Sequence, residues 1–120
     1  MRKIIFYGYP KCSTCRKASN WLEQKGIEYQ FIDIIEKPPS VKYLECAHKQ
    51  YSLDIKKVFN TRSKSFKCLE LDFLDISKEK IIKILSSDGK LIKRPFLVFE
   101  EKTIILGFNE SEYQNLLKLF

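Results

Sequence analysis

The chain has 120 residues and a mass of 14.2 kDa, which suffices for one domain with its own core, and we expect a single domain over residues 1–120. Apolar residues make up 44% of the chain and aromatic residues 13%, so the composition excludes a disordered protein. The 22 basic and 15 acidic residues give a net charge of +7, but the charges are scattered. This charge fits either a solvated basic surface or a site for an anionic partner, whereas direct DNA binding is disfavoured.

No apolar run approaches the roughly 20 residues that a membrane span needs, and the apolar stretch near the N-terminus is too short for a signal peptide. We therefore expect a cytoplasmic protein without membrane contact, in which a framework of structural disulfides is not expected. A zinc site would need a second CxxC pair or two histidines, and His48 is the only histidine. We expect no metal, although the chain has four cysteines: Cys12, Cys15, Cys46 and Cys68.

The first third of the chain begins with an apolar segment, residues 3–7, that is typical of a short buried strand. A turn-forming loop and the CxxC motif follow it. Residues 14–25 predict a helix, because Cys15, Ala18 and Leu22 fall on one face at helical spacing. The inward face of this helix therefore includes the second cysteine of the motif.

Gly26 ends the predicted helix, and alternating apolar residues then predict a second strand over residues 27–35. Strand, CxxC loop, helix and strand together form a βαβ unit. The Pro38-Pro39 pair interrupts the chain after it, and Ser40 is placed to cap a helix that runs to about residue 49 or 51.

The middle of the chain is predicted to be mostly helical. The sequence indicates, in order, a short helix at 53–59, a loop at 60–63, a stretch at 69–74 that fits a helical turn or an extended segment, a helix at 78–86 capped by Ser77, and a turn at Asp88-Gly89.

The end of the chain predicts a hairpin followed by a helix. Two apolar segments, 96–99 and 103–106, flank a short polar turn, as in a β-hairpin. Asn109 is placed to cap the final helix. One face of that helix is predicted to carry Tyr113, Leu116, Leu117 and Phe120.

The CxxC motif carries the clearest chemistry in the sequence. Cys12 lies just before a predicted helix N-terminus, where unpaired N–H groups and the helix dipole stabilise a thiolate. Lys11 and Arg16 add positive charge nearby. Cys15, one helical turn later, is placed to attack an adduct on Cys12 and close a 12–15 disulfide. The alternative is a pair of packed cysteines without a redox role.

Outside the CxxC motif the residues alone are less informative. Arg94 precedes Pro95 at the start of a predicted strand, where a cis bond could face the cysteine loop. Both Arg94 and Arg62 also fit the simpler reading of a surface cation. We expect Cys46 to pack in its helix and Cys68 to be half-buried near a loop.

Several motifs resemble those of the ArsC/Spx family. Residues 9–18, YPKCSTCRKA, are similar to the family's cysteine loop, and four further motifs follow in the family's order at 36–40, 59–62, 91–95 and 107–110. The resemblance implies a thioredoxin-like α/β fold, with a mixed four-stranded sheet flanked by helices and a helical insertion at about residues 37–88. It also implies a cis Pro95, with Arg94 facing the Cys12 loop.

The arsenate reductase branch of the family implies an enzyme. Cys12 matches the nucleophile that attacks arsenate, and Arg16, Arg94 and, less closely, Arg62 match arginines that hold the oxyanion. No cofactor is bound in that branch, and thioredoxin or glutaredoxin with glutathione is the external thiol reductant. This chain departs from it by Gly107, near an expected arginine, and by the presence of Cys15.

The Spx/MgsR-type branch, which has the CxxC motif, implies a redox-sensing regulator that binds the RNA polymerase α subunit. Here Asp54 stands where that branch is expected to have glycine. The sequence thus leaves two hypotheses. In the first, a reductase uses Cys12 to attack arsenate, a disulfide or another oxidant, and Cys15 resolves the adduct. In the second, the same pair is a switch that controls binding to the polymerase.

Overall fold

The computed structural model describes residues 3–118, apart from the side chain of Leu117. Its centre is a four-stranded sheet with the strand order β2-β1-β3-β4. β1 pairs in parallel with β2 and antiparallel with β3, which pairs antiparallel with β4. The strands are β1 (Ile4–Gly8), β2 (Gln30–Asp33), β3 (Phe96–Phe99) and β4 (Thr103–Leu106).

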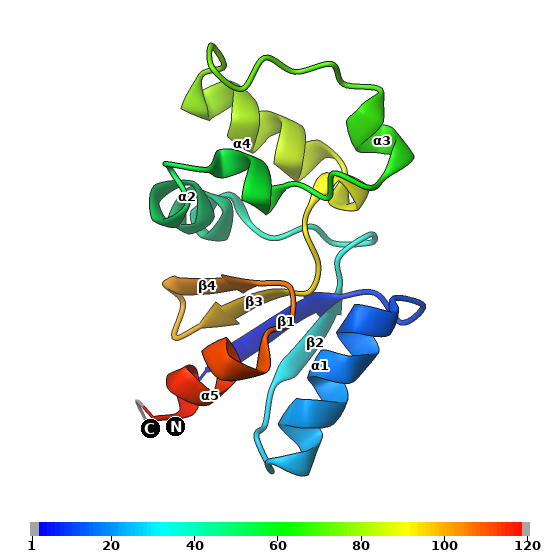
Figure 1. Cartoon of the computed structure of the whole chain (residues 1–120), viewed down its shortest axis with the longest axis vertical. Coiled ribbons are helices and arrows are strands. Elements are labelled where there is room, and N and C mark those ends of the chain that lie inside the picture. The colour runs from blue at the N-terminus through cyan, green and yellow to red at the C-terminus, as the bar shows by residue number, and fades with distance from the viewer. Residues whose placement is uncertain (1–2, 119–120) are drawn as a thin grey trace.

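Helices cover both faces of this sheet (Figure 1). On one face lie α1 (Ser13–Gln24) and α5 (Glu110–Leu117). On the other face lie α2 (Val41–Gln50) and α4 (Lys78–Ser87). The chain between β2 and β3 is mostly helical or irregular, and its short helices are η1 (Ile55–Val58), α3 (Lys64–Lys67) and η2 (Gly89–Leu91). The result is a mixed four-stranded sheet flanked by helices, as the resemblance of the sequence motifs implies.

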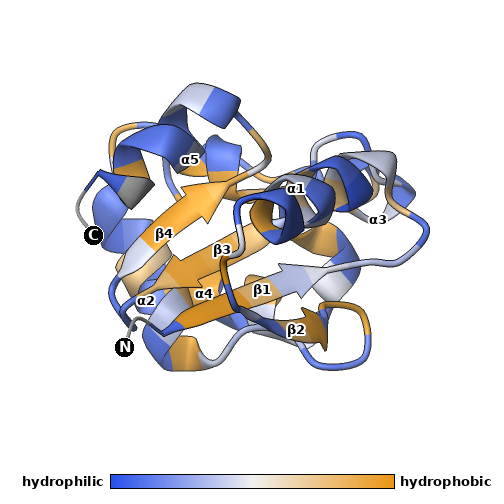
Figure 2. Ribbon diagram, turned by 90° about the horizontal axis from the view of Figure 1, so that it is seen from below, coloured by the Kyte–Doolittle hydropathy of each residue, from blue (hydrophilic) through white to orange (hydrophobic). Residues whose placement is uncertain are grey.

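The core is divided by the sheet, because successive side chains of a strand point to opposite faces. On β1, Ile5 and Tyr7 pack toward α2 and α4, whereas Ile4 and Phe6 pack toward α1 and α5. Figure 2 shows hydrophobic residues concentrated on the strands and hydrophilic residues on the outer helix faces. The predicted inward face of α1 is confirmed, since its buried residues are Cys15, Ala18, Trp21 and Leu22.

The second strand is shorter than the predicted segment 27–35. Gly26 has φ +69°, and the N–H groups of Gly26 and Ile27 donate to the carbonyls of Glu23 and Leu22. Ile27 therefore completes the end of α1, as in a Schellman motif, and cannot begin a strand. Only the four residues of β2 pair with β1, at the edge of the sheet.

The middle of the chain also differs from the prediction. The helix expected at 53–59 is reduced to η1, and Leu53 is 101% exposed. Phe59 leaves the helix to form a β-bridge with Ile92, which draws this segment into the core. Residues 69–74 form no regular helix or strand. The one-turn helix α3 was not predicted, although Ser63 caps it by accepting from the N–H of Phe66.

The helix caps and strand bounds predicted from local sequence patterns were more accurate toward the C-terminus. Ser77 caps α4 and Asn109 caps α5, each through its side-chain oxygen. Both hairpin strands have the predicted bounds. Tyr113 and Leu116 are buried as expected, whereas the Leu117 side chain and Phe120 lie outside the described residues.

The two isolated cysteines occupy different environments. Cys46 is half-buried and packs against the core on α2, as predicted. The prediction for Cys68 was wrong, because this residue is exposed. It follows α3, which is a single turn with no buried residue, so the end of this helix stays at the surface. Within residues 3–118 no helix is long and apolar enough to cross a membrane.

Candidate active site

Cys12 lies between the end of β1 and the first turn of α1. It is the N-cap residue of α1, with extended backbone, and its side chain forms no capping hydrogen bond of ordinary geometry. Its backbone is fixed on both sides: its N–H donates to the Tyr9 carbonyl at 3.0 Å, and its carbonyl accepts from the N–H of Arg16 at 3.1 Å. The thiol is thus held at the positive end of a 12-residue helix.

The two thiols of the motif differ in acidity. Burial opposes ionisation of Cys12, but the N–H and thiol of Cys15 and the guanidinium of Arg94 outweigh it, so the pKa of Cys12 is lowered. Burial, together with the neighbouring Cys12 thiolate, raises the pKa of Cys15 to about 12. Of the two thiols, half-buried Cys12 therefore ionises first, whereas Cys15, which is 2% exposed, stays protonated near neutral pH.

Arg94 reaches Cys12 from the start of β3. The Arg94–Pro95 peptide bond is cis, and the guanidinium lies 5.1 Å from the centre of the Tyr9 ring. A cation above an aromatic face is attracted to it, so Tyr9 restricts where Arg94 points. Tyr9 thus contacts both partners of the site: its ring faces Arg94 and its carbonyl binds the backbone of Cys12.

Cys12 opens into a cavity of about 590 Å³, here called the cysteine cleft. In Figure 1 the loop before α1 and the helix α3 lie on the same side of the molecule, and residues of both line the cleft. No aspartate or glutamate of residues 3–118 lines it. The basic residues of the lining are Arg62, Lys64, Lys90, Lys93 and Arg94.

None of these five basic residues forms an ion pair with a carboxylate in the part of the chain that the structure describes. The ion pairs of residues 3–118 lie elsewhere and involve Lys3, Lys42, Lys57 and Lys78. The cleft is therefore an uncompensated positive site next to an acidic thiol, which suits an anionic ligand.

The structure brings together four of the five predicted polar site residues. Cys12, Arg62 and Arg94 line the cysteine cleft, and Cys15 lies behind Cys12 in the core. Arg16 is not among the residues that line it: Arg16 is exposed, and its backbone N–H donates to the Cys12 carbonyl.

Sequence reasoning missed the three lysines of the cleft. Lys64 lies two residues after the predicted Arg62, and Lys93 directly precedes the predicted Arg94. This closeness in sequence is the one signal that could have identified Lys64 and Lys93. Lys93 lies beside Gly107, near which an arginine was expected: a Cβ atom at position 107 would be 3.4 Å from Cε of Lys93.

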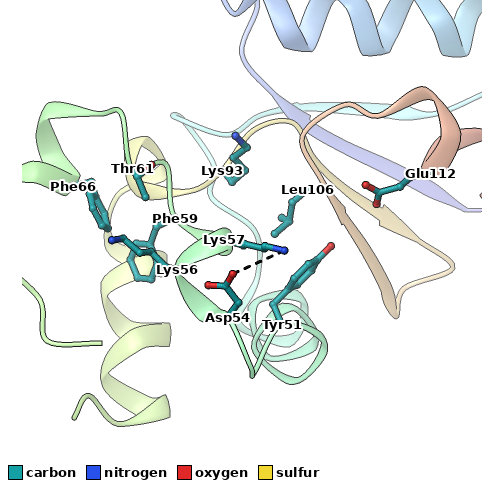
Figure 3. A pocket seen from close by; sticks show the side chains of 10 residues that line it. All are labelled: Tyr51, Asp54, Lys56, Lys57, Phe59, Thr61, Phe66, Lys93, Leu106 and Glu112. Carbon is teal, nitrogen blue, oxygen red and sulfur yellow. Dashed lines mark ion pairs between the residues drawn. The ribbon is translucent and has the colours of Figure 1, made fainter. Parts of the chain in front are cut away.

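A larger cavity of about 800 Å³, here called the Tyr51 cavity, lies next to the cleft and shares Lys93 with it (Figure 3). No cysteine is found among the described residues that line this cavity. Its charges have both signs: Lys56, Lys57 and Lys93 are joined by Asp54 and Glu112, and Lys57 pairs with Asp54 at 3.9 Å. Although this cavity is the larger, its described lining therefore holds no reactive thiol. No cluster of three or more potential metal-ligating side chains occurs within residues 3–118.

The chain is similar to several known proteins. The chain is 42% identical over 113 residues to the uncharacterized protein YusI of Bacillus subtilis (strain 168), covering 92% of this chain and 95% of YusI. It is 30% identical over 114 residues to the global transcriptional regulator Spx of Lactiplantibacillus plantarum, covering 95% and 86% of the two chains.

Solved structures share the fold. A crystal structure described as a possible arsenate reductase from Streptococcus mutans UA159 superposes with a TM-score of 0.86 at 37% identity, covering 97% of this chain and 98% of that one. The thioredoxin-like α/β fold implied by the sequence motifs is thereby confirmed, as is the family resemblance. Residues 7–116 match the ArsC family, and the chain belongs to it.

Proposed function

We propose that this protein is a thiol-dependent reductase in which Cys12 is the nucleophile and Cys15 the resolving thiol. One observation carries the proposal: a cysteine with a lowered pKa faces an uncompensated cationic cleft, with a second thiol directly behind it. The thiolate supplies the nucleophile, and the cations bind an anionic substrate such as arsenate. Arg94 and Arg62 are the arginines that would hold the oxyanion, while Arg16 is not placed to do so.

In the first step the Cys12 thiolate attacks arsenic(V). An S–As bond forms, and one arsenate oxygen takes up protons and leaves as water. A disulfide substrate reacts in the same way: the Cys12 sulfur bonds to one substrate sulfur, and the other leaves as a thiolate that takes up a proton. Before the attack, Arg94 stabilises the negative charge on the Cys12 sulfur. The same guanidinium is close enough to stabilise this charge as it moves from the sulfur onto the substrate.

In the second step Cys15 attacks the Cys12 sulfur, and the Cys15 proton passes to an oxygen of the leaving arsenic group or to the leaving sulfur of a disulfide substrate. The Cys15 pKa of about 12 would make this thiol a poor nucleophile in the resting protein, and the Cys12 thiolate contributes to that elevation. Once Cys12 is bonded to substrate its negative charge is gone, while Arg94 continues to lower the pKa of Cys15. The 12–15 disulfide then forms. The S–As bond breaks and its electron pair stays on arsenic, which leaves as arsenite, so two electrons have moved from the thiols to the substrate.

An external thiol system, thioredoxin or glutaredoxin with glutathione, would return the pair to two thiols. We place this cycle in the cytoplasm, where such reductants are abundant.

The decisive experiment is arsenate turnover by the purified protein, with NADPH consumption coupled separately through thioredoxin and through glutaredoxin. Cys12→Ser should abolish turnover, and Cys68→Ser, which alters an exposed cysteine outside the cleft, should retain it. If Cys15→Ser is active with glutaredoxin alone, an external thiol resolves the adduct. Equal rates for the wild type and Cys12→Ser with arsenate and with disulfide oxidants would refute the proposal.

A second candidate is a redox switch that binds the RNA polymerase α subunit. The observation in its favour is the 30% identity to Spx, a global transcriptional regulator, over 95% of this chain. In this case the 12–15 disulfide would change the surface around the cleft and not turn over substrate. The reduced and the oxidised protein should then differ in how tightly they bind the C-terminal domain of the polymerase α subunit. No complex at about 100 μM in either state, which corresponds to less than about 5.5 kcal/mol of binding, would exclude the switch.

A further inference from the structure

The cysteine cleft is larger and more positive than a single oxyanion requires. Its volume of about 590 Å³ falls in the range of about 300–1,000 Å³ that accommodates drug-sized ligands. Of its five basic residues, Arg94 is the one that acts on the Cys12 sulfur. The other four belong to two separate segments, Arg62 and Lys64 around the start of α3 and Lys90 and Lys93 around η2.

We propose that the cleft binds an acidic polypeptide segment whose cysteine disulfide is the substrate of Cys12. This inference rests on the proposed reductase function and names its substrate class. Carboxylates on the segment would form charge-assisted hydrogen bonds to cations that have no acidic partner among residues 3–118.

Two features of the lining favour a polypeptide over another polyanion. Uncharged hydrogen-bonding side chains, those of Asn60 and Ser65, lie among the cations and can serve a peptide backbone. A nucleic acid would satisfy the cations with phosphates, but it offers Cys12 no sulfur to attack. A disulfide in an acidic segment satisfies both the charge of the cleft and the chemistry of the thiolate.

The reaction is a thiol–disulfide exchange. The Cys12 thiolate bonds to the peptide sulfur, and the peptide's former sulfur partner leaves as a thiol after taking up a proton. Cys15 attacks the Cys12 sulfur and its proton passes to the leaving peptide sulfur, so the 12–15 disulfide forms and the peptide leaves as a thiol. Two electrons pass from the protein dithiol to the substrate disulfide.

The test uses pre-reduced full-length protein in single-turnover reactions, so that no recycling system is needed. The substrates are short peptides with one cysteine joined by a disulfide to 2-thiopyridone, whose release is followed by absorbance. One peptide has aspartate and glutamate beside the cysteine, a second has asparagine and glutamine there, and a third has lysine. A small uncharged substrate, hydroxyethyl disulfide, reports the intrinsic reactivity of the thiols.

We expect the acidic peptide to react at least about tenfold faster than the amide peptide at an ionic strength of about 0.01 M. This advantage should shrink at about 0.15 M, where the Debye length falls from about 30 Å to about 8 Å. The charge-reversal variant Lys64→Glu/Lys90→Glu should abolish the preference and favour the lysine peptide. The control Lys80→Glu/Lys102→Glu makes the same change in net charge at exposed sites outside the cleft and should keep it.

Equal rates with the acidic and amide peptides would overturn the inference while leaving a reductase in place. It would also be overturned if the cleft variant and the control variant lost the preference for the acidic peptide to the same extent. A preference for hydroxyethyl disulfide over every peptide would point to a small substrate and also overturn it. If no disulfide is reduced, the inference fails, and the arsenate assay decides the reductase proposal separately.

Discussion

The cysteine cleft and the Tyr51 cavity lie side by side and share Lys93, but they differ in charge and in chemistry. The Tyr51 cavity is the larger, at about 800 Å³ against about 590 Å³. Its lysines are accompanied by Asp54 and Glu112, whereas the described residues that line the cysteine cleft include five basic side chains and no carboxylate. The smaller cavity alone adjoins a thiol whose pKa is lowered.

This difference shows that cavity size does not identify the reactive site in this protein. A mixed-charge cavity compensates its own cations, as the pair of Lys57 with Asp54 shows. An uncompensated cation next to a thiol instead stabilises the thiolate and attracts an anion. The following substitutions test whether the two cavities are functionally distinct.

The largest effect is expected at Gly89, which begins η2 and so places Lys90 in the cysteine cleft. A Cβ atom at position 89 would lie 1.8 Å from the carbonyl oxygen of Ile34, a backbone atom that cannot easily move. Gly89→Ala should lower the free energy of unfolding by about 3 kcal/mol, measured by urea denaturation.

Gly26→Ala is the matched control. Its Cβ would meet no atom within 4 Å, so only the positive φ of +69° is costly, at about 1 kcal/mol. If both variants lost the same amount of unfolding free energy, the close approach of Gly89 to the Ile34 carbonyl would not be what holds the segment around Lys90 in place.

Removal of the Arg94 guanidinium should have the next largest effect. Because this group helps to stabilise the Cys12 thiolate, Arg94→Ala should raise the pKa of Cys12. The rate of Cys12 alkylation by iodoacetamide at pH 7 should fall about tenfold, and Arg94→Lys should recover part of it. An unchanged rate in Arg94→Ala would mean that the helix terminus alone sets the acidity of Cys12.

A smaller effect is expected at Tyr9, whose ring lies 5.1 Å from the Arg94 guanidinium. Tyr9→Ala should loosen Arg94 and slow Cys12 alkylation at pH 7 by about threefold, since cation–π contacts at such sites contribute about 0.5–1 kcal/mol. Tyr9→Phe keeps the ring and should react like the wild type. If Tyr9→Phe is as slow as Tyr9→Ala, the hydroxyl and not the ring face is responsible.

The smallest effect is expected in the Tyr51 cavity. Lys56 and Lys57 are exposed and do not line the cysteine cleft, and water and salt screen exposed charges. Lys56→Ala and Lys57→Ala should each change Cys12 alkylation by less than about 1.5-fold. A change as large as that of Arg94→Ala would show that the two cavities act as one electrostatic unit.

The sequence predicted those parts of the fold that depend on neighbouring residues. Ser77 and Asn109 cap their helices, and the CxxC loop precedes a helix, because capping and helical spacing are local properties. The second strand was overextended because the hydrogen bonds that tie Ile27 to the end of α1 compete with strand pairing. The short helix η1 ends early because Phe59 pairs with the distant Ile92, which no local pattern reveals.

The candidate site was predicted only in part for the same reason. Cys12 and Cys15 carry a recognisable spacing, and Arg94 was found through its motif with Pro95. Lys90 enters the cleft because the approach of Gly89 to Ile34 sets the path of its segment, a tertiary contact without a local signal. Arg16 has the right spacing along the chain, but its side chain is exposed outside the cleft.

The most direct test of the account is the pH dependence of alkylation at each cysteine of the wild-type protein, followed by mass spectrometry with limiting iodoacetamide. Because only the thiolate reacts, the midpoint of each rate profile gives the pKa of that thiol. We predict a midpoint for Cys12 below the value of about 8.5 of an ordinary thiol, and no reaction of buried Cys15 near neutral pH. A midpoint for Cys12 at or above that of exposed Cys68 would contradict the assignment of Cys12 as the nucleophile.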